Sequence, residues 1–414
     1  MNLVLQQSNI DKTQSSIKIT GSKSETNRLL LLQALYPNIK LENISKSDDS
    51  DAMQMALAFN HQSSTINQID IHHAGTAMRF LTAFFAIQEN KEVVLTGSSR
   101  MKERPIQILV EALKQLGAEI TYEENDGYPP IRIKGKKLIK NRVTLAANVS
   151  SQYISALLLI APKLDNGLEL TLQGEITSVP YIKMTLALLN EIGVETSFKK
   201  NTITVCHAEL VSASKLTIES DWSSASYFYS IVALSGIGTE IKLSSYKENS
   251  LQGDSALTEI YKDFGVETTF QENSILLRKT NNCQLSIVNY QLNNSPDIAQ
   301  TIAVTCFGLG IGCHLTGLHT LKIKETDRLE ALKIELSKLG AIVSVTNDSL
   351  TIEKSNNLNS NISIATYQDH RMAMAFAPLA LKTSIIINEA EVVSKSFPSF
   401  WEDLKNIGFQ ISEV

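Results

Sequence analysis

The stretch "ALKQLGAEITY", residues 112–122, joins the end of an amphipathic helix to the start of a strand. Leu113 and Leu116 are spaced for one helical face, and Gly117 follows as a residue that can adopt the left-handed backbone of a helix C-terminus. Apolar and polar side chains then alternate, which is typical of a strand. The stretch therefore predicts a helix that ends at a glycine and leads directly into a strand.

The same pattern returns four more times, as "LLNEIGVETSF", "IYKDFGVETTF", "ELSKLGAIVSV" and "DLKNIGFQISE". Successive glycines are 76, 72, 75 and 68 residues apart, so the 414-residue chain has room for about six units. A degenerate sixth copy is expected at residues 48–66, where no glycine ends the helix. Unrelated α/β units that share a helix ending are the alternative, but the near-constant period favours a repeat.

Each unit also carries a second helix that is apolar almost all round, as in "TAMRFLTAFFAIQ" and "SSASYFYSIVALSG". Helices of this kind are expected to be buried within their domain. Six units therefore predict an α/β protein with two domains of three units each, divided near residues 217–226.

Composition narrows the class of protein. The formal net charge of −5 argues against a nucleic-acid-binding surface spread over the molecule. The longest apolar runs are too short to cross a membrane, and the N-terminus has no pattern of a signal peptide. The four cysteines have no spacing typical of a metal site, so reduced thiols in a cytoplasmic protein are expected. They are Cys206, Cys283, Cys306 and Cys313.

In the first half of the chain, cations and small hydroxyl residues stand where helices are expected to begin. Free backbone N–H groups at such positions favour a phosphate or another anion. Ordinary helix caps or solvated loops remain the alternative for each motif. The residues are Lys23, Ser24 and Arg28 in "GSKSETNR", Gly75 in "HHAGTAMRF", Arg104 in "SRMKERPIQIL", Ser150, Ser151 and Gln152 in "NVSSQYISALL", and Ser178 and Tyr181 in "TSVPYIKMT".

In the second half, "KIKETDRLEAL" at residues 322–332 predicts a helix start capped by Thr326 or Asp327. Lys324 and Arg328 are four residues apart, which would place two cations on one helical face and predicts a bound anion. Asp297 in "NNSPDIAQTIAV" is either an N-cap or a base. Further cations follow at Arg371 in "YQDHRMAMAFA" and Lys395 in "SKSFPSFWEDL".

Taken in order, these motifs resemble those of the 5-enolpyruvylshikimate-3-phosphate synthase family, most specifically "AGTAMRF", "KETDR" and "DHRMAMAF". The resemblance implies an α/β fold of two similar domains, each with three βαβαββ repeats. This is the inside-out α/β barrel of the enolpyruvyl transferases, with a cleft between the domains. It also implies one domain of residues 1–20 and 220–414 and another of residues 21–219.

The activity implied is transfer of the enolpyruvyl group of phosphoenolpyruvate to the 5-hydroxyl of shikimate 3-phosphate through a tetrahedral intermediate, with release of phosphate. This step belongs to the shikimate pathway of chorismate and aromatic amino-acid biosynthesis. The resemblance further implies a cytoplasmic monomer that needs no metal or organic cofactor, binds only small molecules and is inhibited by glyphosate.

The family's functional residues are carried over by motif. Asp297 would accept the hydroxyl proton and Glu325 would protonate the methylene carbon, with Lys324 and Lys23 assisting. Shikimate 3-phosphate would contact Lys23, Ser24, Arg28, Ser150, Ser151, Gln152, Ser178, Tyr181, Asp297, Thr320 and Lys324. Phosphoenolpyruvate would contact Lys23, Gly75, Arg104, Gln152, Arg328, Arg371 and Lys395.

Three residues depart from the family pattern: His73 and Thr320 replace a usual Asn, and Val179 replaces a commoner Lys. One alternative is the related enolpyruvyl transferase that acts on UDP-N-acetylglucosamine, but "SSRMKERPIQI" lacks the cysteine expected there. Another is a catalytically silent anion-binding protein on the same repeat. The joint presence of acids and cations at the family's catalytic positions argues against that reading.

Overall fold

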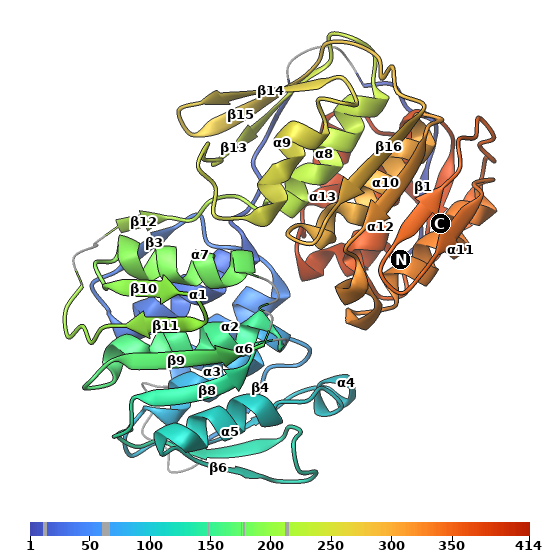
Figure 1. Ribbon diagram of the computed structural model, residues 1–414. Coiled ribbons are helices and arrows are strands. Elements are labelled where there is room, and N and C mark those ends of the chain that lie inside the picture. Colours follow the sequence, from blue (N-terminus) through green and yellow to red (C-terminus); the bar gives the residue numbers. More distant parts are fainter. Residues whose placement is uncertain (11–14, 60–66, 148, 175, 177–178, 212–214) are drawn as a thin grey trace. The chain divides into compact units, whose positions relative to one another are not determined.

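The computed structural model describes the chain except for residues 11–14, 60–66, 148, 175, 177–178 and 212–214. The described residues divide into two compact units; in Figure 1 the elements from yellow to red belong to unit 1, which also contains the blue N-terminal segment. Unit 1 comprises Met1–Thr20 and Glu219–Val414, and unit 2 comprises Gly21–Ile218. The second boundary lies one residue from the position expected from the sequence.

One sheet pattern recurs through the described chain. In unit 2, β4 (Asn67–Asp70) pairs in parallel with β5 (Glu92–Thr96), which pairs antiparallel with β7 (Ile131–Lys134). β7 then pairs antiparallel with β6 (Glu119–Tyr122). Four further sheets have the same sequence of one parallel and two antiparallel pairings.

In the order of pairing, these sheets contain β8 (Arg142–Ala146), β9 (Leu168–Gln173), β11 (Thr202–Val205) and β10 (Thr196–Lys199); β2 (Ser15–Ile17), β13 (Glu240–Ser244), β15 (Ser274–Lys279) and β14 (Val266–Gln271); β16 (Ile287–Gln291), β17 (Gly312–Thr316), β19 (Leu350–Ile352) and β18 (Val343–Val345); and β20 (Ile362–Ile364), β21 (Ile385–Ile387), β1 (Leu3–Leu5) and β22 (Ile411–Glu413).

The sixth copy keeps only the parallel pair among the described residues. β3 (Lys40–Glu42) pairs with β12 (Lys215–Thr217), and α2 (Asp48–Ala58) supplies the helix of the predicted degenerate copy. Residues 60–66 of that copy lie outside the described residues. The repeat is confirmed in five copies, and the sixth is shortened.

The glycine before each of these strands has the backbone that the sequence predicted, although helix α9 (Leu257–Ile260) ends five residues before its glycine, Gly265. α5 (Gln107–Leu116) ends at Gly117, whose φ of 106° is in the left-handed region. The four corresponding glycines, Gly193, Gly265, Gly340 and Gly408, also have positive φ. Glycine adopts this conformation without the steric penalty of a Cβ, so the chain can turn at once into the next strand.

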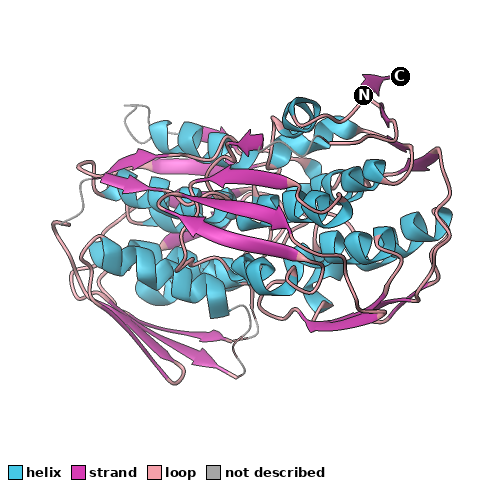
Figure 2. Ribbon diagram, turned by 90° about the horizontal axis from the view of Figure 1, so that it is seen from above, coloured by secondary structure: helices cyan, strands magenta, loops and turns pink. Residues whose placement is uncertain are grey.

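The apolar helices lie in the interior of each unit. In unit 1, α8 (Trp222–Leu234) is buried along its whole length and packs against α10 (Ala299–Gly308), which packs against α12 (His370–Phe376). In unit 2, α3 (Gly75–Ala86) packs against α6 (Ser151–Ile160) and α1 (Lys23–Leu35). In Figure 2 strands lie in front of some of these helices.

Shorter or more exposed helices complete the units. They are α4 (Ser99–Lys102), α7 (Val179–Glu191), α9 (Leu257–Ile260), α11 (Arg328–Lys338) and α13 (Phe400–Asn406), with the 3₁₀ turns η2 (Ala161–Lys163), η3 (Gly253–Ala256), η4 (Pro296–Ile298), η5 (His319–Ile323), η6 (Ala377–Leu381) and η7 (Ala390–Lys395). None of the described helices has both the length and the apolar character needed to span a bilayer.

Candidate active site

The predicted residues of unit 2 gather at helix starts. Lys23 is the first residue of α1, and Gly75 is the first residue of α3. Ser150 caps α6, its Oγ accepting from the backbone N–H of Gln152 at 3.4 Å. Gln152 in turn donates from Nε2 to Thr76 Oγ1 at 3.1 Å, which brings the starts of α3 and α6 together. Backbone N–H groups at these positions suit an anionic ligand.

Arg28 is held inside unit 2 by hydroxyls and aromatic rings. Its Nε donates to Thr185 Oγ1 at 2.8 Å and its Nη2 to Ser155 Oγ at 3.0 Å. The guanidinium carbon lies 5.4 Å from the ring centroid of Phe80 and 5.8 Å from that of Tyr181, within cation–π range. Burial lowers the pKa of Arg28 to about 10, so it remains a cation at neutral pH.

The start of α2 supplies acids to this region of unit 2. Lys23 Nζ lies 3.8 Å from Asp49 Oδ2, and His73 Nε2 lies 3.9 Å from Asp48 Oδ2. Asp48 and Asp49 occupy the first turn of α2, where the helix dipole favours negative charge. His73, which stands in place of the Asn expected from the family pattern, therefore lies close to the carboxylate of Asp48.

Gly75 and Arg104 are close neighbours. The Arg104 guanidinium lies directly against Gly75, and it would have to shift if a Cβ were added there. Arg79, which the sequence analysis missed, fixes the surroundings by donating to Gly75 O and to Pro105 O, each at 3.1 Å. Tyr153 donates its hydroxyl to the same Pro105 carbonyl at 2.7 Å. The signal that could have revealed Arg79 is a single charged residue within the apolar "AMRFLTAFF".

Ser178, another predicted ligand, lies outside the described residues.

Arg328 is the centre of the predicted cluster in unit 1. Its Nε donates to Asp369 Oδ2 at 2.6 Å, its Nη1 to Asp297 Oδ1 at 2.9 Å and its Nη2 to Glu325 Oε2 at 2.7 Å. Only 2% of the Arg328 side chain is exposed. Three carboxylates of the protein therefore neutralise the cation that the sequence analysis paired with a bound anion.

The helix start in this cluster differs from the prediction in one respect. Asp327 caps α11 by accepting from the N–H groups of Leu329 and Glu330 at 3.1 and 3.2 Å, as expected. α11 begins at Arg328, however, and Lys324 precedes it with an extended backbone, ψ −146°. Lys324 and Arg328 are therefore not an i, i+4 pair on one helical face, because the cap at Asp327 separates them.

Asp297 lies in η4 and makes no cap bond to α10. Its carboxylate is 3.3 Å from Lys324 Nζ and 3.6 Å from Arg371 Nη2, in addition to its bond with Arg328. Burial would raise the pKa of Asp297, but Lys324, Arg371 and Arg328 together hold it well below its usual range. The N-cap reading is wrong, and the carboxylate remains a candidate base.

Two further acids of unit 1 were not predicted as functional. Asp369, which is fully buried, caps α12 by accepting from Arg371 N at 2.8 Å while it binds Arg328. Burial and the charge of Asp297 raise the pKa of Asp254 to about 7. Neither acid has a sequence signal beyond its helix-capping or loop context, because each acquires its partners from distant segments.

The remaining predicted residues of unit 1 are at the edge of the cluster. Lys395 Nζ donates to the Gln368 carbonyl at 2.8 Å, next to Asp369. Thr320 lies in η5, and its buried Oγ1 has no hydrogen-bond partner within the described residues.

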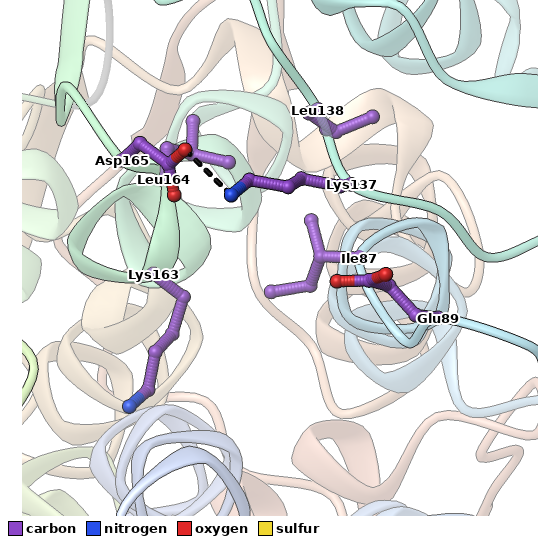
Figure 3. Close-up of a pocket in the computed structure, with 7 residues that line it drawn as sticks. All are labelled: Ile87, Glu89, Lys137, Leu138, Lys163, Leu164 and Asp165. Atoms are coloured by element: carbon purple, nitrogen blue, oxygen red, sulfur yellow. Dashed lines mark ion pairs between the residues drawn. The ribbon is translucent and has the colours of Figure 1, made fainter.

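A separate pocket of about 140 Å³ in unit 2 includes none of the predicted residues (Figure 3). It is bordered by an ion pair of 2.8 Å between Lys137 and Asp165. The described His, Cys, Asp and Glu residues form no group able to hold a metal ion.

The repeated sheets and the buried helices are the fold of the enolpyruvyl transferases. Residues 8–404 match the family described as EPSP synthase (3-phosphoshikimate 1-carboxyvinyltransferase), and the chain belongs to this family. It is 45% identical over 401 residues to the 3-phosphoshikimate 1-carboxyvinyltransferase of Bacteroides fragilis strain YCH46, covering 96% of each chain. Its identity to the Shewanella pealeana enzyme is 36%, covering 96% of this chain and 98% of the relative.

Solved structures support the same fold. EPSP synthase from Acinetobacter baumannii superposes with a TM-score of 0.83 at 20% identity, with full coverage of both chains. The enolpyruvyl transferase NikO from Streptomyces tendae gives a TM-score of 0.75 at 12% identity, covering 100% of this chain and 98% of that one. The expected family and fold class are thereby confirmed.

Proposed function

We propose that this chain transfers the enolpyruvyl group of phosphoenolpyruvate to the 5-hydroxyl of shikimate 3-phosphate and releases phosphate. Family membership supports the reaction. The observation that carries the proposal for this chain is Asp297, a carboxylate surrounded by Lys324, Arg328 and Arg371 within 3.6 Å. A base beside several cations is the combination required to deprotonate a hydroxyl next to an anionic substrate.

In unit 1, Asp297 takes the proton of the 5-hydroxyl of shikimate 3-phosphate. The hydroxyl oxygen at the same time forms a bond to C2 of phosphoenolpyruvate. Glu325 delivers a proton to the methylene carbon, which gives the tetrahedral intermediate. Loss of phosphate, with return of a methyl proton to Glu325, then restores the double bond in the product. Arg328, Arg371 and Lys395 bind the phosphoenolpyruvate anion, since guanidinium groups match carboxylate and phosphate oxygens.

In unit 2, Arg28 and the starts of α1 and α6 supply the groups for shikimate 3-phosphate. Arg28 carries the fixed charge, and its hydroxyl neighbours orient it. Lys23, Gly75 and Arg104 complete the phosphoenolpyruvate contacts, and Gln152 reaches both substrates. The remaining shikimate 3-phosphate ligands in this proposal are Ser24, Ser150, Ser151, Ser178, Tyr181, Thr320 and Lys324.

The test is release of inorganic phosphate from shikimate 3-phosphate and phosphoenolpyruvate by the purified chain. We expect release only when both are present. Replacement of shikimate 3-phosphate by UDP-N-acetylglucosamine is the matched control. Phosphate release with UDP-N-acetylglucosamine but not with shikimate 3-phosphate would show the activity of the related transferase. No release with either acceptor would indicate a catalytically silent binding protein.

The proposal includes a cytoplasmic monomer that uses no cofactor. Cysteines without a pairing pattern support the compartment. Light scattering of the pure protein tests the oligomeric state, and an unchanged rate after dialysis against a chelator tests the absence of a metal.

A further inference from the structure

The segment that precedes α12 has an unusual backbone. Tyr367 and Gln368 have φ values of 54° and 55°, and no other adjacent non-glycine residues among those described both have positive φ. Side chains other than glycine rarely adopt this conformation, and it persists only where surrounding contacts enforce it. The contacts that hold residues 365–369, here called the strained turn, therefore need an explanation.

Helix α11 holds the strained turn at two points. Arg328 and Glu335 are seven residues apart, so they lie on one face of the helix, and both are buried. Arg328 binds Asp369 at one end of the turn. Glu335 accepts from Ala365 N at 3.2 Å and from the Tyr367 hydroxyl at 2.7 Å at the other end.

The anchor carboxylate is fully buried and well supplied with donors. Glu335 has no exposed surface, and Lys338 Nζ lies 2.7 Å from its Oε2. Burial and the bond to Glu335 raise the pKa of Tyr367, so its hydroxyl stays a donor throughout the working pH range. Without the Tyr367 hydroxyl, Glu335 would still accept from Lys338 and from Ala365 N, so the tyrosine bond serves as a specific constraint on the turn.

The strained turn positions two hydrogen-bonding groups beside the cluster around Asp297. Its last residue, Asp369, fixes the Arg328 guanidinium, and the Gln368 carbonyl accepts from Lys395 Nζ at 2.8 Å. Neither Glu335 nor Tyr367 touches Asp297 or its cations by any hydrogen bond or ion pair in the described structure. An effect of the Tyr367 hydroxyl on the cluster therefore passes through the backbone of the turn, whereas Glu335 is also linked to Arg328 along α11.

We propose that Glu335 and Tyr367 are positioning residues that act through the strained turn to align Arg328 and Lys395 for the anionic substrate bound by unit 1. The inference rests on the proposed function, because it takes that anion to be phosphoenolpyruvate. A misalignment of about 1 Å in such a constellation reduces catalysis by roughly a hundredfold, so loss of one hydroxyl should be measurable.

The experiment compares Tyr367→Phe with wild type in steady-state phosphate release. The matched control is Tyr290→Phe, which removes another tyrosine–carboxylate bond of unit 1, 2.6 Å to Asp263, away from the cluster. We expect Tyr367→Phe to raise the KM for phosphoenolpyruvate roughly tenfold. The KM for shikimate 3-phosphate should stay within about twofold, and the control should change neither.

A second pair of variants tests the carboxylate. Glu335→Gln should reproduce the effect of Tyr367→Phe, whereas Glu330→Gln, which loses the neighbouring ion pair with Lys333 on the same helix, should not. Since the two anchor residues act through one bond, the double variant should be little worse than either single variant. If Glu335→Gln does not fold, Tyr367→Phe decides alone.

The outcomes separate this inference from the proposed function. An unchanged KM for phosphoenolpyruvate in Tyr367→Phe, with an active wild type, overturns the positioning role only. A uniform loss of active protein with both KM values unchanged identifies a structural bond and also overturns it. A wild type that releases no phosphate refutes the proposed function, and the inference falls with its premise.

Discussion

Replacement of Arg328 by methionine removes a buried charge while it keeps much of the side-chain volume. In wild type, Arg328 binds three carboxylates between 2.6 and 2.9 Å. Glu325 is 37% exposed, so water can replace its partner at small cost, about 1 kcal/mol or less. Asp297 keeps Lys324 and Arg371. The main loss in the free energy of unfolding therefore comes from the third carboxylate partner of Arg328.

That acid is Asp369, which has no exposed surface and would keep only the backbone N–H of Arg371 as a donor from the bonds described above. Removal of one partner from a buried ion pair costs about 3–5 kcal/mol. We expect Arg328→Met to lower the free energy of unfolding of unit 1 by this amount at pH 7. Arg278→Met, which breaks an exposed pair with Glu240, is the control and should cost less than about 1 kcal/mol.

The sign of the pH dependence follows from Asp297. Its folded pKa is held below the unfolded value of about 3.9, so its contribution is complete above that value and is lost as pH falls through the folded pKa. Arg328→Met weakens this depression. The part of the difference between wild type and variant that comes from Asp297 should therefore be fully present near pH 7 and shrink below about pH 4.

Urea unfolding followed by tryptophan fluorescence measures this difference. Both tryptophans, Trp222 and Trp401, belong to unit 1, so the signal reports that unit alone. A loss no larger than that of Arg278→Met at pH 7 would refute the reasoning. A loss that persists undiminished into acid would show that Asp297 contributes nothing to the difference.

Three further predictions concern single contacts. Asp297→Asn should lower kcat by about a hundredfold or more in phosphate release, with unit 1 still folded by fluorescence, because it removes the proposed base. Gly75→Ala should push Arg104 aside and raise the KM for phosphoenolpyruvate and the glyphosate inhibition constant together, roughly tenfold; unchanged values for both would contradict the steric argument. Phe80→Leu removes one ring beside Arg28 and should raise the KM for shikimate 3-phosphate about threefold, without effect on that for phosphoenolpyruvate.

Local sequence signals were sufficient for the repeat. A left-handed glycine after an amphipathic helix is determined by adjacent residues, and the glycines at 117 and 340 have the predicted backbone. The cap at Asp327 is equally local. The relation of Lys324 to Arg328 was misjudged because spacing alone cannot show where a cap interrupts a helix.

Contacts between distant segments had no such signal. Glu335 accepts a hydrogen bond from Tyr367, which is 32 residues further along the chain. In the sequence, Glu335 is only a polar residue near a helix end. Arg328 likewise donates a hydrogen bond to Asp369, which is 41 residues further along the chain. The sequence showed that charges were present, but whether a substrate or the protein's own carboxylates neutralise them depends on packing between repeats.

The low pKa of Asp297 raises a question about its role as a base. A carboxylate stabilised by three cations binds a proton weakly in the unliganded protein. When the phosphoenolpyruvate anion binds Arg371 and Arg328, as proposed, it offsets part of their field at Asp297, so the pKa of Asp297 should rise. The base then gains strength only in the loaded enzyme. Since activity is lost as pH falls through the pKa of the base, the acidic limb of kcat should lie at higher pH than that of kcat/KM for phosphoenolpyruvate. If the acidic limbs of the kcat and kcat/KM profiles coincide, the substrate does not bind the cations that lower the pKa of Asp297.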